Sequence, residues 1–267
     1  MPPPPAVPEE APPPPRARRG AASTPERKRL DLLLVERGLC ATRQKAQAAV
    51  LAGWVRVEGR VVDKPGLRFP DGAALEVAAP GCPYVSRGGI KLEGALRGFS
   101  VEVEGRVCLD VGASTGGFTD CLLQHGAARV YALDVGYGQL AWKLRRDPRV
   151  VVIERTNARR LSRELVPEPL DLVTIDVSFI SLKLIVPAVL PLLKPAGRIL
   201  PLVKPQFEVG KGLVGKGGVV RDPALHERVL EDLRAFFRGL GLTASAPLAS
   251  PIAGPKGNRE FFLLLRP

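Results

Sequence analysis

From Ser86 to the end of the chain, short apolar runs alternate with stretches that carry apolar residues at helical spacing. Glycine, proline or charged residues bound the runs, as is typical of buried β-strands. This alternation predicts an α/β fold with a doubly wound, mostly parallel sheet. The runs that predict strands are Val107–Val111, Val130–Leu133, Val150–Glu154, Leu170–Ile175, Ile199–Val203 and Phe261–Leu265, and the helical stretches are Gly89–Leu96, Phe118–His125 and Pro223–Phe237.

The pattern in residues 29–78 predicts a smaller α+β module ahead of this sheet. An apolar stripe that starts at Leu30 predicts a helix, which Gly38 can end. Thr42 can cap a second helix, and the alternating residues 55–62 predict a β-hairpin. A module of this size gains stability by docking onto its neighbour.

Two segments fall outside these globular regions. Residues 1–28 are rich in proline, alanine and arginine, which predicts a disordered tail, either a basic tether for RNA or a dispensable end. Residues 79–85 contain proline and glycine and predict a linker into a larger domain that spans 86–267.

Composition indicates which partners and which cellular location the protein can have. A net charge of +12 and a pI near 10.0 favour a polyanionic partner, nucleic acid before an acidic membrane. Proline and charged residues interrupt the most apolar stretch, 184–203, and the N-terminus lacks an apolar signal core, so we expect a cytoplasmic protein without a membrane span. Four cysteines without C-x-x-C spacing suit structural thiols, and two histidines make a histidine-based metal site improbable.

A glycine-rich turn follows the first strand of the larger domain, at residues 112–117, and Asp134 ends the next strand. Such a turn lets a ligand approach the backbone closely, and an acid at the second strand end can bind both hydroxyls of a ribose. A dinucleotide site would need glycine where Ser114 stands. A hydrolase would need a histidine late in the sheet, where neither His125 nor His226 falls.

S-adenosylmethionine, which has no pyrophosphate, fits this turn best. The residues predicted to bind it are Asp110, Gly112, Ser114, Gly116, Gly117, Asp134 and Asn157.

Four ionisable residues should meet at one edge of the sheet. Asp176 and Lys204 each follow a parallel strand, and Glu260 opens a last strand that shares this edge if it runs antiparallel. Lys91 lies in the helical stretch before the first strand. Neither the proline-rich loop of amine methylation nor a cysteine nucleophile of carbon methylation is placed here, so the group suits activation of a hydroxyl. Ordinary salt bridges at strand ends are the alternative.

The small module resembles the αL-type RNA-binding module first named from a ribosomal protein of the small subunit. The residues that carry the resemblance are Arg29-Leu30-Asp31, Gly38, Thr42-Arg43, Ala46 and Gly53–Gly59. The resemblance implies RNA binding through Arg29, Arg43 and Lys45.

Over residues 29–267, the chain as a whole resembles the TlyA family of rRNA 2′-O-methyltransferases, historically called hemolysins. The motifs that carry this resemblance are Tyr84–Leu92, Asp110–Phe118, Ala132–Leu140, Asp176–Ser181, Leu202–Glu208 and Gly257–Glu260. It implies a class I methyltransferase fold of the FtsJ type, ribosomal RNA or a ribosomal subunit as partner, and the 2′-hydroxyl of a cytidine as substrate. The family's catalytic tetrad corresponds to Lys91, Asp176, Lys204 and Glu260.

Two further expectations concern the RNA. The loop after Lys204 is rich in glycine and carries Lys211 and Lys216, which suits either a lid that grips RNA or a flexible surface loop. Family members that modify both ribosomal subunits tend to carry an extra C-terminal helix, which the sequence lacks after Pro267, so the resemblance favours the large subunit.

Overall fold

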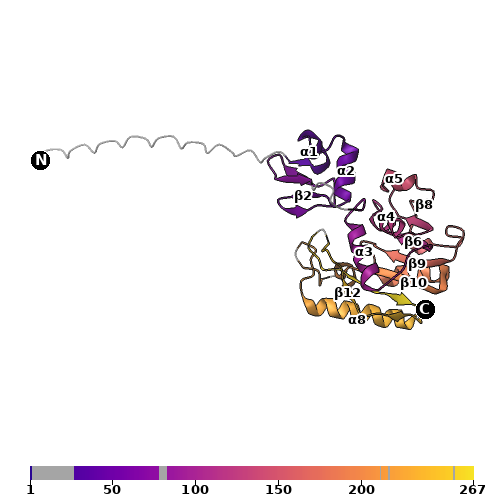
Figure 1. The fold of residues 1–267 in the computed structure, drawn as a ribbon. Coiled ribbons are helices and arrows are strands. Elements are labelled where there is room, and N and C mark those ends of the chain that lie inside the picture. The colour runs from indigo at the N-terminus through magenta and orange to yellow at the C-terminus, as the bar shows by residue number, and fades with distance from the viewer. Residues whose placement is uncertain (2–26, 78–82, 211, 216, 255) are drawn as a thin grey trace.

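The computed structural model describes residues 1, 27–77, 83–210, 212–215, 217–254 and 256–267. Lys211 and Lys216, which were predicted to bind RNA, lie outside the described residues, as does nearly all of the proline-rich tail. Figure 1 shows two bodies, a small N-terminal module and a larger domain built on a twisted sheet. Within the described segments, no helix is long and apolar enough to cross a membrane.

The N-terminal module combines two helices with two small antiparallel sheets. Helix α1 buries Leu30, Leu33 and Leu34, and the core of the module also contains Ala46 and Val50 of α2. The three-stranded sheet has the order β3-β2-β5, and β1 pairs separately with β4. The elements are β1 (Arg27–Arg29), α1 (Leu30–Glu36), α2 (Arg43–Leu51), β2 (Val55–Val57), β3 (Arg60–Val61), β4 (Arg68–Pro70) and β5 (Leu75–Val77).

The sequence pattern predicted both helices and the hairpin of this module correctly. The Thr42 side chain caps α2 by accepting the Lys45 N–H at 3.2 Å. The pattern did not predict the β1–β4 pair, because Arg27–Arg29 and Arg68–Pro70 show no apolar alternation.

The larger domain has a nine-stranded mixed sheet whose main order is β11-β14-β10-β9-β6-β7-β8. Strands β6 to β10 are mutually parallel, and β13 and β14 run antiparallel to β10. The strands are β6 (Val107–Val111), β7 (Arg129–Leu133), β8 (Val150–Ile153), β9 (Leu170–Ile175), β10 (Leu193–Val203), β11 (Thr243–Ala244), β12 (Leu248–Ala249), β13 (Phe261–Phe262) and β14 (Leu265–Arg266).

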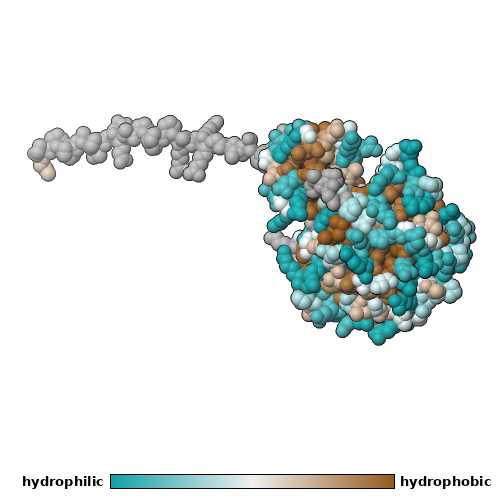
Figure 2. Space-filling view, in the orientation of Figure 1, coloured by the Kyte–Doolittle hydropathy of each residue, from teal (hydrophilic) through white to brown (hydrophobic). Residues whose placement is uncertain are grey.

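Helices cover both faces of this sheet, because its strands expose apolar residues alternately to each side. Leu109 packs in one core with α6 and α8, whereas Cys108 packs in the other with α3 and α4. Most of the surface in Figure 2 is hydrophilic, with small hydrophobic patches. The helices are α3 (Gly88–Gly98), α4 (Gly117–Gln124), α5 (Trp142–Arg145), α6 (Leu182–Val189), α7 (Pro205–Glu208) and α8 (Pro223–Gly239), with 3-10 turns at Ala158–Arg160 and Leu190–Leu192.

Two predicted strands differ from the observed ones. The predicted last strand, Phe261–Leu265, is divided into β13 and β14, although it is antiparallel as expected. Strand β10 begins at Leu193, earlier than predicted, with an irregular register between Leu193 and Arg198. Proline and glycine in that part of β10 masked its strand character in the sequence.

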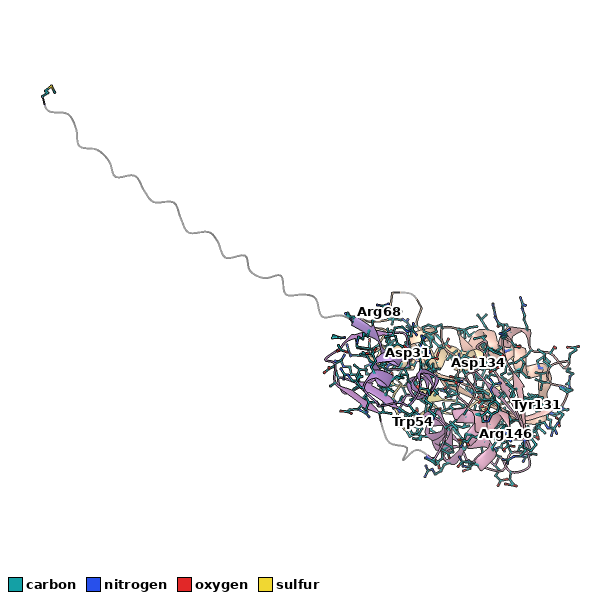
Figure 3. All side chains as sticks on the ribbon, turned by 90° about the horizontal axis from the view of Figure 1, so that it is seen from above. Asp31, Trp54, Arg68, Tyr131, Asp134 and Arg146 are labelled. Atoms are coloured by element: carbon teal, nitrogen blue, oxygen red, sulfur yellow. The ribbon has the colours of Figure 1, made fainter. Side chains whose placement is uncertain are left out.

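The module lies at the end of the sheet where β6, β9 and β10 finish. The Arg87 N–H donates a hydrogen bond to the carbonyl of Ala52 at 3.4 Å. The ammonium of Lys64 lies over the ring of Phe179, 5.4 Å from its centroid. Figure 3 shows the labelled Asp31 in this module and Asp134 in the larger domain. The sheet edge that carries the predicted chemistry is therefore covered partly by the module.

Candidate active site

The glycine-rich turn between β6 and α4 has a backbone that favours glycine at two positions. Gly112 and Gly116 have φ values of +88° and +96°. A Cβ on Gly112 would lie 2.5 Å from the backbone oxygen of Asp176. A Cβ on Gly116 would collide with the side chains of Leu140 and Leu144. The turn is therefore packed tightly against both the strand end that carries Asp176 and the residues around α5.

Asp134 follows β7 and fixes the conformation of this turn. Its carboxylate accepts the N–H of Ser114 at 2.8 Å and the N–H of Gly136 at 2.7 Å. Asn157 caps a 3-10 turn instead, because its side-chain oxygen accepts the Arg159 N–H at 3.0 Å. The end of β7 thus presents an acid directly behind the turn.

The structure places Asp110, predicted to contact the cofactor, away from the cavity. It is fully buried, and its carboxyl group accepts hydrogen bonds from Thr119 Oγ1 at 2.7 Å and Thr174 Oγ1 at 3.4 Å. Burial raises the pKa of Asp110 to about 7, against the opposing effect of the Thr119 hydrogen bond. Asp110 belongs to the face of β6 that packs on α4, and its hydrogen bond with Thr119 links β6 to the helix that follows the turn.

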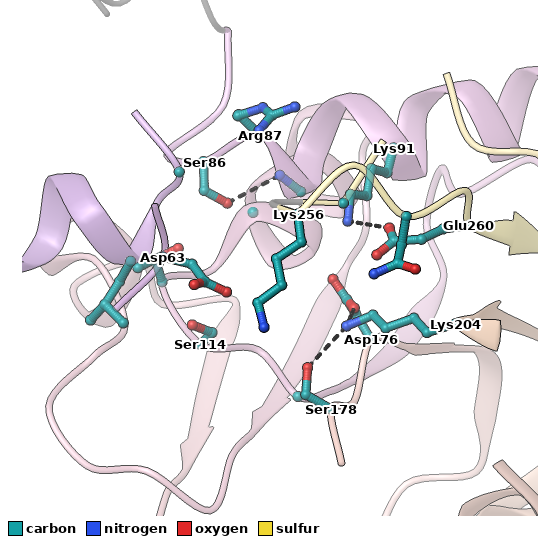
Figure 4. Close-up of a pocket in the computed structure, with 18 of the residues that line it drawn as sticks. Asp63, Ser86, Arg87, Lys91, Ser114, Asp176, Ser178, Lys204, Lys256 and Glu260 are labelled. Carbon is teal, nitrogen blue, oxygen red and sulfur yellow. Dashed lines mark hydrogen bonds and ion pairs between the residues drawn. The ribbon is translucent and has the colours of Figure 1, made fainter. Parts of the chain in front are cut away.

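Two lysine–carboxylate pairs stand beside the turn (Figure 4). Lys91 Nζ lies 2.6 Å from Glu260 Oε2, and these side chains are 10% and 1% exposed. Lys204 Nζ lies 2.6 Å from Asp176 Oδ1, and these are 11% and 20% exposed. Lys204 also donates a hydrogen bond to Ser178 Oγ at 3.1 Å. Helix α3, the ends of β9 and β10, and the start of β13 together deliver the four residues to one place.

The two pairs act electrostatically on each other. Burial alone would raise the pKa of Asp176, but the ammonium groups of Lys204 and Lys91 outweigh it and hold that pKa below its ordinary value. Burial would lower the pKa of Lys204, but Asp176 and Glu260 outweigh it and raise that pKa. Both Asp176 and Lys204 are therefore charged at neutral pH.

A cavity of about 490 Å³ joins the turn to the two pairs. Of the residues predicted from sequence, it is lined by Gly112, Ser114, Gly117, Lys91, Asp176, Lys204 and Glu260. Asp110, Gly116, Asp134 and Asn157 do not line it. Asp63 and Lys64 of the N-terminal module form part of its wall. The cavity thus lies between the module and the sheet edge.

Two aromatic residues at this cavity were missed by sequence reasoning. Phe179 is 78% exposed and has a φ of +64°, a conformation that non-glycine residues rarely adopt. Its ring centroid lies 4.9 Å from that of Phe207. An exposed phenylalanine held in this way provides an apolar face next to Lys204. The available signal in the sequence was a phenylalanine that closely follows Asp176, in the run Asp176-Val177-Ser178-Phe179.

The predicted RNA-binding residues of the module surround a buried carboxylate. Asp31 is fully buried and accepts two hydrogen bonds from Arg29 at 2.9 Å, one from Arg43 at 3.0 Å and one from Gln47 at 2.8 Å. The Arg29 and Arg43 side chains remain 37% and 54% exposed. Lys45, in the first turn of α2, is also exposed. Asp31 therefore fixes two guanidinium groups that can still reach a ligand.

The two histidines lie outside the cavity. The His226 ring is buried, and its Nε2 lies 2.9 Å from the carbonyl oxygen of Val220. Nδ1 of His125 lies 2.9 Å from the carbonyl oxygen of Cys121. No cluster of histidine, cysteine, aspartate or glutamate among the described residues could hold a metal ion.

Comparison with known proteins identifies both parts of the chain. Residues 84–267 match the FtsJ-like methyltransferase family, and residues 28–74 match the S4 domain. The 16S/23S rRNA (cytidine-2′-O)-methyltransferase TlyA of Mycobacterium tuberculosis is 52% identical over 90% of this chain and 90% of that protein. Hemolysin A of Brachyspira hyodysenteriae is 44% identical over 87% of this chain and 97% of that protein.

The same relationship holds in three dimensions. A solved structure from Streptococcus thermophilus, described as a candidate hemolysin, has a TM-score of 0.70 and 45% identity, and the match covers 90% of this chain and 88% of that one. The chain therefore belongs to the TlyA, or hemolysin A-like, family of rRNA methyltransferases.

Proposed function

We propose that the protein transfers a methyl group from S-adenosylmethionine to the 2′-hydroxyl of a cytidine in ribosomal RNA. The observation that carries this proposal is the convergence of the Lys91–Glu260 and Lys204–Asp176 pairs on a cavity that the glycine turn also lines. A turn built for close backbone approach suits a cofactor, and paired ammonium groups suit a reaction that develops negative charge on oxygen.

The residues present fit S-adenosylmethionine. Gly112 and Gly117 both line the cavity. A Cβ on Gly112 would meet the Asp176 backbone oxygen, and one on Gly117 would meet Ser86 Oγ, so glycine is what lets this turn pack closely at the cavity wall. Ser114 lines the cavity, and its N–H donates a hydrogen bond to the Asp134 carboxylate. Asp134 lies at the strand end where class I folds bind a ribose. When bound, S-adenosylmethionine supplies an electrophilic methyl group on a sulfonium centre. The chain's own residues position it and prepare the acceptor oxygen.

Lys204 acts on the acceptor oxygen in this proposal. A ribose hydroxyl is a weak nucleophile at neutral pH, and a nearby cation stabilises the alkoxide character that the oxygen gains as its proton leaves. Asp176 and Glu260 raise the pKa of Lys204, so the lysine stays protonated. This favours Lys204 as a charged hydrogen-bond donor and leaves Asp176 or water to accept the proton.

Lys91 and Glu260 have a supporting role. Their ion pair is more deeply buried than that of Lys204 and Asp176. Glu260 helps to keep Lys204 charged, and Lys91 helps to keep Asp176 ionised. The pair therefore sets the electrostatic field in which the reacting pair operates.

RNA enters this proposal through both parts of the chain. Arg29 and Arg43 offer guanidinium groups for phosphate, and Lys45 adds a cation at the start of α2. A base turned out of its stack can rest on Phe179, because stacking on an exposed aromatic ring is a general mode of RNA recognition. This would bring the attached ribose to Lys204.

The names of two relatives support the choice of base and subunit. TlyA of Mycobacterium tuberculosis is named for cytidine in 16S and 23S rRNA, and TlyA of Campylobacter jejuni for cytidine in 23S rRNA. Because 23S rRNA is common to both names, we propose large-subunit rRNA as the substrate. We also propose that the protein acts on this RNA in the cytoplasm.

The product itself tests this proposal. Large-subunit rRNA incubated with the protein and S-adenosylmethionine is digested to nucleosides and analysed by mass spectrometry. The proposal requires a gain of 2′-O-methylcytidine. A methyl group found on a base instead of a ribose would refute the assigned acceptor.

A further inference from the structure

A third lysine extends into the active-site cavity. Lys256 lies in the loop before β13 and lines the same cavity as Lys91 and Lys204. Figure 4 shows its side chain extending into the pocket among the labelled residues. A Cβ on Gly218 would lie 3.2 Å from Lys256 Nζ, so the ammonium lies beside the segment around Gly218. Lys256 thus reaches the cavity from the larger domain.

Described residues on both sides of Lys256 make hydrogen bonds. The N–H of Gly257 bonds to the carbonyl of Gly254 at 2.9 Å, and the N–H of Gly254 bonds to the carbonyl of Asn258 at 3.0 Å. The Asn258 side chain is buried, accepts the Val220 N–H at 3.0 Å and donates to the carbonyl of Gly218 at 2.9 Å. These bonds fix the base of the Lys256 side chain relative to the cavity.

Lys256 differs electrostatically from the two tetrad lysines. Lys91 and Lys204 are each 2.6 Å from a carboxylate oxygen. Within the described parts of the chain, no ion pair to a carboxylate involves Lys256. The positively charged residues that line the cavity are Lys64, Arg87, Lys91, Lys204 and Lys256, and the negatively charged ones are Asp63, Asp176 and Glu260. This excess of positive charge favours an anionic ligand.

We propose that Lys256 binds a phosphate group of the RNA next to the target ribose. The inference rests on the proposed function, because it places the ribose of an RNA at Lys204. A lysine ammonium binds phosphate as a point charge. Lys256 belongs to the larger domain and Lys64 to the module, and a polynucleotide that enters the cavity between these two bodies must carry its phosphates past them.

The carboxylate of S-adenosylmethionine is the competing anion in this cavity. The proposed cofactor site is the glycine turn, whereas the Lys256 ammonium lies beside Gly218, in the segment that precedes α8. This location favours the RNA phosphate. Lys256 is then a substrate-positioning residue that fixes the ribose while Lys204 acts on its hydroxyl.

Lys256→Gln tests the proposal, with Lys256→Arg as the charge-preserving variant. We expect Lys256→Gln to raise KM for the RNA substrate about 10-fold, because it loses one charge-assisted contact. The slope of log K for RNA binding against log salt should fall by roughly 1. S-adenosylmethionine affinity, measured by calorimetry without RNA, should stay unchanged, and Lys256→Arg should restore both RNA values.

Lys194→Gln is the matched control, because Lys194 pairs with Asp171 at the opposite end of β9 and β10. A Lys256→Gln variant with weakened cofactor affinity and an unchanged salt slope would overturn the proposal in favour of the carboxylate. A Lys256→Gln variant with unchanged cofactor affinity and an unchanged salt slope would show that Lys256 binds neither anion. Failure of the wild-type protein to methylate RNA would instead refute the proposed function, and the salt slope would still test the phosphate contact.

Discussion

Gly112 and Asp176 approach each other so closely that a Cβ on Gly112 would lie 2.5 Å from the Asp176 backbone oxygen. Gly112 belongs to the proposed cofactor turn, and Asp176 belongs to the proposed catalytic tetrad. The two functions therefore share one backbone contact between the ends of β6 and β9, which are neighbouring parallel strands. A change in one should disturb the other.

Gly112→Ala tests this coupling. The added methyl group meets a backbone atom that cannot move aside easily, and the φ of +88° is unfavourable for alanine. We expect lower thermal stability together with a loss of both S-adenosylmethionine binding and turnover. Gly138→Ala is the matched control, because Gly138 has a φ of +69° but no atom within 4 Å of the position that a Cβ would take. If the two variants bind the cofactor equally well, the contact with Asp176 has no functional role.

The buried Lys91–Glu260 pair should contribute to folding as well as to turnover. Glu260→Ala leaves the Lys91 ammonium buried without its partner, which costs roughly 3–5 kcal/mol of unfolding free energy. Adding Lys91→Ala removes that uncompensated charge and should recover part of the stability. Activity should stay lost in the double variant, because Lys204 no longer has Glu260 nearby. Urea denaturation and methyl-transfer assays on the wild type, the single variant and the double variant measure both effects, and recovered activity in the double variant would contradict the proposed tetrad.

Asp110 should make stability depend on pH. Burial raises its pKa from the ordinary 3.8 to about 7, so the folded state favours the protonated carboxyl. Its stabilising effect is complete below about pH 4 and is lost as pH rises through about 7. Each unit of pKa shift corresponds to about 1.4 kcal/mol, so the loss is of the order of a few kcal/mol.

Asp110→Asn keeps an acceptor for Thr119 and cannot ionise. The unfolding free energy of the wild type, relative to this variant, should therefore fall between about pH 4 and about pH 7 and level off above. Urea titrations at several pH values give this difference directly. Parallel curves for the two proteins would show that Asp110 does not titrate in this range.

Phe179 should act on RNA and not on the cofactor. Base stacking on an aromatic ring contributes about 1–3 kcal/mol, so Phe179→Ala should lower kcat/KM for RNA by roughly 10- to 100-fold. Phe179→Tyr keeps the aromatic face and should retain most activity. Calorimetry should give the same S-adenosylmethionine affinity for all three proteins. Equal kcat/KM values for the alanine variant and the wild type would remove Phe179 from substrate binding.

Much of this site could be predicted from sequence because strand ends are easy to locate. The apolar run Leu170–Ile175 ends directly before Asp176, and β10 ends directly before Lys204. Parallel pairing of these strands then brings the two side chains together. Glu260 lies beside Asp176 and Lys204 because the strand that it precedes runs antiparallel to β10. This direction is the condition under which Glu260 was expected to share the edge.

The remaining features depend on tertiary contacts that local patterns do not encode. Asp110 lies on the same face of β6 as Cys108, and only the packing of α4 on that face shows that its carboxyl binds Thr119. Phe179 has a left-handed φ, which the local pattern does not indicate. The approach of Lys64 to its ring requires the assembled domains. The contribution of Asp63 and Lys64 of the N-terminal module to the wall of the candidate active site could not be foreseen from either segment alone.

Methyl transfer to isolated ribosomal subunits measures the proposed reaction itself. The purified protein, Lys204→Ala and the control Lys194→Ala are each incubated with methyl-labelled S-adenosylmethionine and unmodified large or small subunits. We predict label in large-subunit rRNA at a ribose, reduced roughly 10²- to 10⁴-fold by Lys204→Ala with cofactor affinity unchanged, and retained by Lys194→Ala. Near-normal turnover in Lys204→Ala would refute the proposed role of Lys204. No label in either subunit despite cofactor binding would refute ribosomal RNA as the substrate.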